Sequence, residues 1–200
     1  MATETRRRMR APERRKQLLE VARKVFGGRG YHTVTMDDVA KESGVTKPIL
    51  YDHFPSKRDL YRALLEADLA NLKQRVADAL ESSPGNRERI RASFQAYFDF
   101  VDEEGEGFRL LMQESVGPER EFQEMVFRFR DEVLDEVTKV LIRESRGNLD
   151  ENEAADVALG LIGMVEMVAQ RNPGASKRNR KRTDDTLVRL AWRGITGLKA

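Results

Sequence analysis

Seven residues close together in the N-terminal third of the chain have side chains suited to contacting a nucleic acid. They are Thr46, Lys47, Pro48, Ile49, Tyr51, His53 and Lys57. Hydroxyl, ammonium and imidazole groups can donate to phosphate oxygens, and lysine and threonine can also bond to base edges. This mixture is unusual for a helix that only faces solvent. It therefore indicates a binding surface, which the neighbouring elements must hold in place.

The helix before this surface is predicted from its capping residues and its apolar face. Thr35 can accept a hydrogen bond from an early backbone N–H, and Asp38 can reach back as in a capping box. The apolar residues at positions i, i+3 and i+4 are Met36, Val39 and Ala40. Gly44 ends this helix, because glycine enters the left-handed conformation without a Cβ penalty.

A second short helix follows the turn at Gly44 and carries the candidate contact residues. Thr46 can cap it, and Pro48 is tolerated in its first turn. The residues expected to pack back on the first helix are Val45, Leu50 and Phe54. Ser56 and Asp59 form another capping box, so a third helix follows. Two helices joined by a short glycine-containing turn form a helix-turn-helix, whose second helix enters the DNA major groove.

Between residues 35 and 60 the chain resembles the TetR family of transcriptional regulators. The matching residues are Thr35, Val39, Ala40, Ser43, Gly44, Val45, Thr46, Leu50, Tyr51, His53, Phe54, Ser56, Lys57 and Leu60, with Phe26 and Tyr31 upstream. The chain departs from the family at Pro48, where the family often has glycine, and Ile49 follows. The resemblance implies an all-α protein with an N-terminal three-helix DNA-binding domain and a larger helical domain that binds a ligand and dimerises.

The resemblance also implies distinct roles for the candidate contact residues. Tyr51, His53 and Lys57 would touch phosphates, and Thr35 would join backbone N–H groups in holding one. The residues nearest the base edges would be Thr46, Lys47, Pro48 and Ile49. A lysine can donate to guanine acceptors, and an apolar group can contact a thymine methyl. Outside such a motif, a tyrosine or histidine on a helix is more often packed than bound to DNA.

Basic residues are unevenly distributed along the chain. Its 36 basic and 34 acidic residues give a formal net charge of +2. Residues 1–16 nevertheless hold seven basic residues and only two acidic ones. A flexible arm over residues 1–10 could bind phosphates and enter the minor groove beside the recognition helix. The alternative is a disordered, solubilising tail.

The remainder of the chain has helical periodicity and no strand pattern. We expect the helix-turn-helix domain over residues 11–60, with the motif at 35–54, and a helical ligand-binding and dimerisation domain over residues 61–200. The helices expected after residue 60 are 60–80, one from Asn86 to the glycines at 105 and 107, 108–114, 118–147, about 152–170 and 184–198.

The last two helices, about residues 152–171 and 184–198, have wide apolar faces. The resemblance implies that they form a four-helix homodimer interface with a second copy. Alternatively, they pack inward as in any helix bundle. The basic segment 173–182 between them contains five basic residues and no acidic one. We expect a solvated linker there and not a second DNA-binding patch.

Phenylalanine and methionine are frequent in the larger domain, and we expect most of them in its core. The resemblance implies a small-molecule pocket among them. The candidate ligand contacts are Phe94, Phe98, Met112, Gln113, Met125, Met164 and Met167, and Glu166 could orient a ligand. We expect a repressor that binds a palindromic, double-stranded DNA operator as a homodimer. A small, mostly apolar effector would release it by changing the spacing of its two recognition helices.

The sequence gives no indication of an enzyme. It has no cysteine, its histidines His32 and His53 lack metal-ligand spacing, and no glycine-rich phosphate loop follows a strand. We expect no cofactor, no metal and no membrane contact. The absence of a signal peptide, of a transmembrane run and of cysteine predicts a cytoplasmic protein, and the resemblance to the TetR family implies a bacterial one. Two alternatives stay open: a sequence-tolerant architectural DNA-binding protein, and a helical adaptor without an effector.

Overall fold

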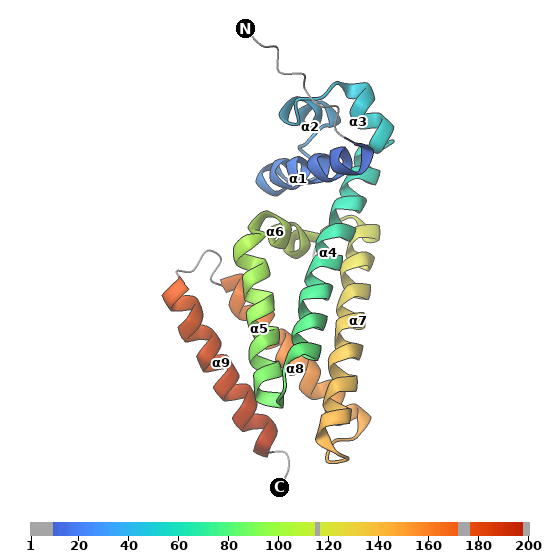
Figure 1. Ribbon diagram of the computed structural model, residues 1–200. Helices are drawn as coiled ribbons and strands as arrows, with labels where there is room; N and C mark the ends of the chain where they lie inside the picture. The colour runs from blue at the N-terminus through green and yellow to red at the C-terminus, as the bar shows by residue number, and fades with distance from the viewer. Residues whose placement is uncertain (1–9, 115–116, 172–176, 198–200) are drawn as a thin grey trace. The chain divides into compact units, whose positions relative to one another are not determined.

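The structure, a computed structural model, describes residues 10–114, 117–171 and 177–197 (Figure 1). Every regular element in these ranges is an α-helix, which confirms the predicted all-α fold. The helices are α1 (Ala11–Arg29), α2 (Met36–Glu42), α3 (Lys47–His53), α4 (Lys57–Ser82), α5 (Asn86–Glu103), α6 (Gly105–Glu114), α7 (Arg120–Ser145), α8 (Glu151–Arg171) and α9 (Lys177–Gly197).

The chain divides into two compact units, Met1–Glu66 and Ala67–Ala200. Helix α4 begins in the first unit and continues into the second. Most of the predicted basic arm, residues 1–9, lies outside the described residues. Arg10 is described, and it occupies the N-cap position of α1.

The first unit is a three-helix arrangement closed by the start of α4. Leu18, Ala22 and Phe26 of α1 are fully buried. The Phe26 ring lies 4.9 Å from that of Tyr61 at the start of α4, and Tyr61 lies 4.7 Å from Tyr31. These three aromatic rings pack α1, the loop after it and α4 into one core, because large rings bury much apolar surface at a single point.

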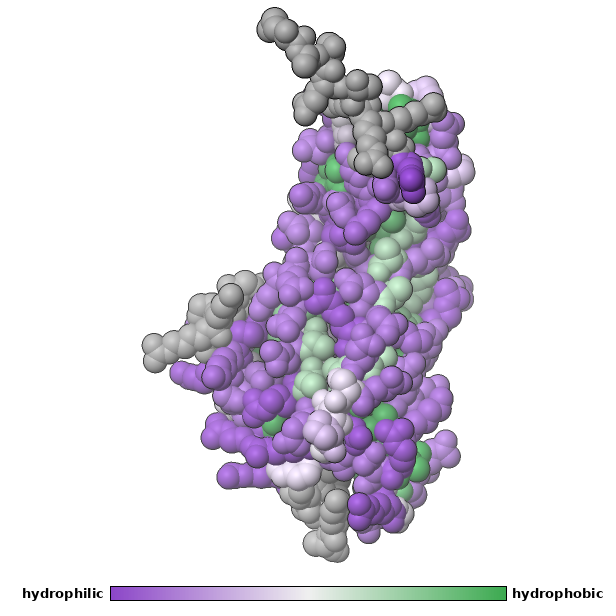
Figure 2. Space-filling view, in the orientation of Figure 1, coloured by the Kyte–Doolittle hydropathy of each residue, from purple (hydrophilic) through white to green (hydrophobic). Residues whose placement is uncertain are grey.

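The second unit is a bundle in which α7 packs along α8 and α5 packs along α9 (Figure 1). Its core comes from the apolar faces that the sequence periodicity predicts on α5, α7 and α8. Fully or almost fully buried side chains include Phe98, Phe100, Leu110 and Phe122. The face drawn in Figure 2 is mainly hydrophilic. No helix within the described ranges is both long and apolar enough to cross a bilayer.

Residues 177–182 of the basic segment do not form the linker that their composition predicts. Helix α9 starts at Lys177 instead of near residue 184, and residues 177–182 form its first turns, while residues 173–176 lie outside the described residues. Arg180 is only 7% exposed, and its Nε donates to Asp102 Oδ2 of α5 at 3.1 Å. Its guanidinium lies 4.8 Å from the centre of the Phe98 ring. Asp102 is 78 positions away from Arg180 in the sequence, so this contact could not be predicted from the composition of the basic segment.

Two helix boundaries also differ from expectation. Gly85, not Asn86, is the N-cap of α5, and α6 begins at Gly105 instead of residue 108. The glycines at 105 and 107 thus lie within a helix. Helix α5 ends at Glu103, and Glu104 separates the two helices.

Candidate functional site

The turn between α2 and α3 has the predicted geometry. The Thr35 hydroxyl accepts a hydrogen bond from Asp38 N at 3.2 Å, and Asp38 Oδ2 accepts one from Thr35 N at 2.8 Å, which completes the capping box. Gly44 has a φ of +63°, in the left-handed region that favours glycine. Its N–H donates to the Lys41 carbonyl, so the chain reverses tightly after α2.

Helix α3 buries one face and exposes the other. Leu50 is fully buried and Phe54, its C-cap residue, is 1% exposed, while Val45 before the helix is half-buried. The opposite face presents Ile49, which is 41% exposed, and Tyr51, which is 45% exposed. The exposed residues that precede Ile49 are Thr46, Lys47 and Pro48. Five of the seven candidate contact residues therefore lie in the open.

Thr46 occupies the N-cap position of α3 without capping it. Its backbone is extended, with φ −80° and ψ 153°, but its side chain makes no capping hydrogen bond. The sequence correctly places the start of α3 and is wrong about the hydroxyl. This hydroxyl keeps its hydrogen-bonding capacity for another molecule.

Lys47 forms an ion pair across the motif. Its Nζ lies 2.6 Å from Asp37 Oδ2 on α2, and both side chains are 60% exposed. The hydrogen bond to Asp37 raises the pKa of the Lys47 ammonium. The pair is solvent-exposed, so it can exchange for another acceptor at little cost.

Two cations hold the ends of the motif. Arg15 of α1 donates from Nη1 to the His53 carbonyl at 3.2 Å, and its guanidinium lies 4.3 Å from the centre of the Phe54 ring. Lys57 at the start of α4 donates from Nζ to the carbonyls of Tyr31 and Val34, both at 3.0 Å. His53 and Lys57 are half-buried, so they are less accessible than the other candidate contacts.

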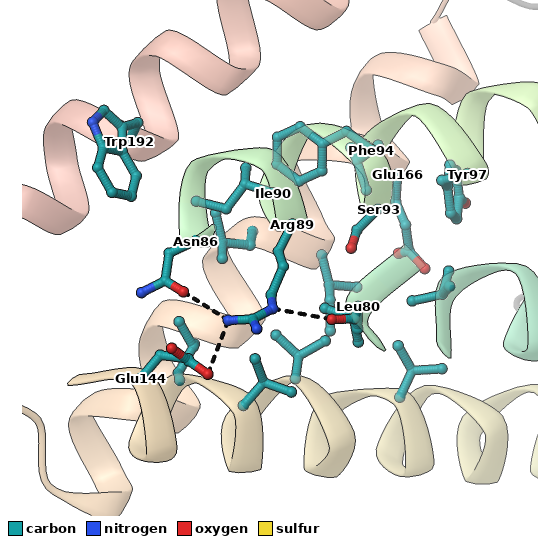
Figure 3. Close-up of a pocket in the computed structure, with 18 of the residues that line it drawn as sticks. Leu80, Asn86, Arg89, Ile90, Ser93, Phe94, Tyr97, Glu144, Glu166 and Trp192 are labelled. Carbon is teal, nitrogen blue, oxygen red and sulfur yellow. Dashed lines mark hydrogen bonds and ion pairs between the residues drawn. The ribbon is translucent and has the colours of Figure 1, made fainter. Parts of the chain in front are cut away.

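A largely apolar cavity lies inside the second unit, with a free volume of about 130 Å³ (Figure 3). Its apolar lining includes Leu72, Val76, Leu80, Ile90, Phe94, Val133, Val137, Leu161, Val165 and Trp192. These residues come from α4, α5, α7, α8 and α9. One water needs roughly 10–15 Å³ by a comparable measure, so this space is far larger than a packing defect.

Polar groups in the cavity wall are mostly paired with each other. Arg89 donates from Nε to the Leu80 carbonyl at 3.1 Å, and its Nη1 lies 2.8 Å from Asn86 Oδ1 and 2.9 Å from Glu144 Oε1 (Figure 3). The Glu166 carboxylate lies 3.3 Å from Nη2 of Arg130. Burial raises the pKa of Glu166, and the nearby arginine opposes that shift. Each acid thus has a basic partner.

Ser93 on the cavity wall is the exception. Its hydroxyl oxygen is buried and, within the described part of the chain, has no hydrogen-bond partner. A buried hydroxyl without a partner costs free energy, so a polar atom of a ligand is a natural acceptor or donor for it.

The predicted ligand contacts agree only in part with this cavity. Phe94 lines it, as does Glu166, but the other six candidates do not. Those six residues are Phe98, Met112, Gln113, Met125, Met164 and Met167. Phe98 is covered by Arg180, Gln113 faces solvent and Met167 is 66% exposed. Residue type alone therefore does not identify the residues that line this cavity. Three further polar residues of the cavity wall, Arg89, Ser93 and Glu144, were not predicted from the sequence, although the polar pair Asn86 and Arg89 on one turn of α5 is a signal in it.

The helices of the predicted dimer interface carry exposed apolar residues. Leu159 and Met167 of α8 are 59% and 66% exposed, and Leu190 of α9 is 61% exposed. Where such residues gather in one contiguous patch, they mark an interaction surface. No group of three or more acidic or histidine side chains suited to a metal ion is found among the described residues.

Comparisons with known proteins match both units of the chain. A family model described as "Bacterial regulatory proteins, tetR family" matches residues 18–64. A second, described as "Tetracyclin repressor-like, C-terminal domain", matches residues 86–194. Together they cover the helix-turn-helix and most of the helical bundle.

Individual relatives are also transcriptional regulators. The chain is 38% identical over 190 residues to the HTH-type transcriptional activator FasR of Mycolicibacterium smegmatis, covering 94% of this chain and 86% of that protein. It is 35% identical over 89 residues to the HTH-type transcriptional repressor KstR2 of Mycobacterium tuberculosis, covering 44% of each. A solved TetR-like regulator from Rhodococcus sp. RHA1 has a TM-score of 0.77 at 28% identity, covering 95% of this chain and 100% of that one.

The capping box of α2 gives a test by pH. The Thr35 hydrogen bonds, assisted by Arg29 at 3.1 Å, lower the pKa of Asp38 from 3.8 to about 2. A carboxyl with a lowered pKa in the folded state stabilises the fold above its unfolded pKa and loses that contribution as the pH falls through the folded pKa. We expect the urea midpoint of the wild type to fall more steeply between pH 3.8 and about 2 than that of Asp38→Asn.

The matched control is Asp52→Asn, since Asp52 is exposed and forms no ion pair within the described ranges. Its midpoint should follow the wild-type profile. An Asp38→Asn profile parallel to that of the wild type would show that the capping box does not carry this pH dependence.

Proposed function

Because the chain belongs to the TetR family of bacterial transcriptional regulators, we propose that it binds a palindromic operator as a homodimer and is released by a small, mostly apolar effector. The family consists of DNA-binding regulators and not of enzymes. The observation that carries the proposal is the face of α3, where Lys47, Ile49 and Tyr51 are exposed opposite the buried Leu50.

The recognition residues divide into two groups. Thr46, Lys47, Pro48 and Ile49 form the edge that reads bases, and their exposure supports this role. Tyr51 and His53 contact phosphates, as does Thr35 at the start of α2. Lys57 uses two of its three N–H donors on the carbonyls of Tyr31 and Val34, so the third is the donor it offers to a phosphate.

The homodimer forms through α8 and α9. A two-fold axis repeats α3 at a fixed spacing, so the dimer matches two half-sites of opposite orientation. The exposed Leu159, Met167 and Leu190 support this interface, because together they offer apolar surface on both helices.

The effector occupies the cavity of the second unit. The apolar lining favours an apolar body, and the paired carboxylates leave no unbalanced acid to repel or attract a charged group. Ser93 supplies a hydrogen bond to one polar atom of the effector. Binding changes the preferred spacing of the two recognition helices, which lowers operator affinity through a coupling of roughly 1–3 kcal/mol.

The sign of regulation follows from where the operator lies. Release from an operator that overlaps the promoter relieves repression, and a repressor is what we expect from the sequence. Release from an upstream operator ends activation, and the relative FasR is named an activator. The same change in the protein would end either repression or activation. Transcript levels of the regulated genes in a deletion strain distinguish the two, because they rise if the protein is a repressor and fall if it is an activator.

Replacing Lys47 tests base reading. We expect Lys47→Ala to reduce discrimination between the operator and a half-site variant by about tenfold, since one good base contact contributes roughly 1–3 kcal/mol of discrimination. Tyr51→Phe should weaken binding to all sequences alike, because a phosphate contact carries no sequence information. Fluorescence anisotropy with the operator, found by footprinting on genomic DNA, measures both. Equal weakening of every sequence by Lys47→Ala would contradict its role.

Charges placed on the exposed apolar residues test the dimer. Leu159→Glu combined with Leu190→Glu should give a monomer in sedimentation experiments, because like charges would face each other across the two-fold axis. The footprint should then shrink or vanish. Phe127→Glu is the control, since Phe127 is 46% exposed on α7, outside the proposed interface. A double variant that stays dimeric would refute the assignment of α8 and α9.

Filling the cavity tests the effector site. Trp192 is the only tryptophan and lines the cavity, so its fluorescence reports on occupancy. Decanol, a neutral apolar probe, should change this emission in the wild type. In Val137→Phe the added ring takes the space, and we expect decanol affinity to fall by about tenfold. Ile142→Phe, on the same helix but outside the cavity, should behave like the wild type. Unchanged decanol binding in Val137→Phe would contradict the site.

A further inference from the structure

A cleft between α5 and α9 carries more positive charge than the packing of two helices requires. Its free volume is about 470 Å³, and its walls hold five cationic side chains and one carboxylate, that of Asp185. The cations are Arg87 and Arg91 of α5 with Lys181, Arg182 and Arg189 of α9. The cleft thus includes part of the basic segment, which neither the recognition surface nor the apolar cavity explains.

The clustering of these cations opposes folding. Arg87 and Arg91 are four residues apart, and like charges at this spacing destabilise a helix. In the ranges that the structure describes, Arg87, Lys181 and Arg182 form no ion pair with a carboxylate. Cations that outnumber the nearby carboxylates in one cleft raise the local concentration of negatively charged ligands.

Ion pairs between α5 and α9 fix the walls of the cleft at two levels along α9. Arg91 Nη1 lies 2.6 Å from Asp185 Oδ1 and 3.4 Å from Asp184 Oδ2. One turn earlier, Arg180 binds Asp102 and is almost fully buried. These contacts set the register of α9 against α5, so the other cations are held close together before any ligand arrives.

We propose that this cleft binds a ligand with at least two phosphoryl groups, such as inorganic pyrophosphate or the diphosphate of a nucleotide. Guanidinium groups pair with phosphate oxygens through two parallel hydrogen bonds, and four of the five cations are arginines. A singly charged ligand would leave most of the positive charge uncompensated. The lining has no aromatic or large apolar side chain among the described residues, so the cleft recognises the phosphoryl groups and not a base or an acyl chain. This proposal does not depend on the proposed function.

Calorimetric titration of the full-length protein tests the ligand chemistry. Pyrophosphate, ADP, AMP, sulfate and citrate are compared at equal ionic strength, because screening alters every such affinity. We expect pyrophosphate and ADP to bind at least about tenfold more tightly than AMP and sulfate, since the second phosphoryl group adds charge-assisted hydrogen bonds. Citrate or AMP binding as tightly as pyrophosphate would overturn the diphosphate assignment.

A charge-matched pair of variants tests the place of binding. Arg87→Gln combined with Arg182→Gln removes two cations that have no ion pair among the described residues. Arg128→Gln combined with Lys139→Gln removes two exposed cations of α7, outside the cleft. Pyrophosphate affinity should fall by about tenfold or more in the first variant and stay unchanged in the second. Equal affinity of both variants would overturn the proposal.

Measurements of operator affinity test whether the cations of the cleft contact DNA instead of a phosphorylated ligand. The salt dependence of operator affinity counts the phosphates that a protein neutralises. We expect the variant with Arg87 and Arg182 replaced to keep the wild-type salt slope. A smaller slope without pyrophosphate binding by the wild type would assign the cleft to DNA and overturn the proposal. If operator binding were absent altogether, the pyrophosphate titrations would still decide this question.

Discussion

The shortness of α3 is the constraint on which the rest of the first unit depends. It has only seven residues, and isolated helices shorter than about 12–15 residues are marginal in water. Its order must therefore come from tertiary contacts. Leu50 and Phe54 are almost completely buried, and Arg15 binds the last carbonyl of the helix. The exposed face of α3 is therefore positioned by the packing of the opposite face.

A polar residue of α3, Lys47, is also held by a contact to a neighbouring helix. Asp37 lies 2.6 Å from Lys47 in the free protein, and because both side chains are solvent-exposed, an acceptor on DNA can replace the carboxylate at little cost. A solvated phosphate offers little more than Asp37 does, whereas a base edge with two acceptors in line offers two hydrogen bonds. Under the role proposed for Lys47, exchange of Asp37 for a base edge thus gains more than exchange for a phosphate, and specificity arises from that difference of affinities.

Local sequence signals predicted the fold and the motif well. The structure contains the capping box at Thr35, the hydrogen bond from Asp59 N to the Ser56 hydroxyl, the left-handed Gly44 and the helical periodicity, all of which are short-range features. The cavity was poorly predicted because its lining depends on how five helices meet. Met167 and Phe94 look alike in sequence, yet one is exposed and the other lines the cavity. Only the relative rotation of the helices distinguishes them.

The roles of the charged residues in the basic segment were likewise not predictable from local sequence. Arg180, Lys181 and Arg182 are consecutive, but successive residues of a helix point about 100° apart. One rotation sends Arg180 to Asp102 and Phe98 in the interior, and the next two residues to the cleft. Composition assigns all three the same solvated role. Once α9 packs on α5, however, the buried Arg180 fixes the rotation of α9. Lys181 and Arg182 then lie in the wall of the cleft. The ion pairs between α5 and α9 thereby determine which of the adjacent positive charges are buried and which are exposed.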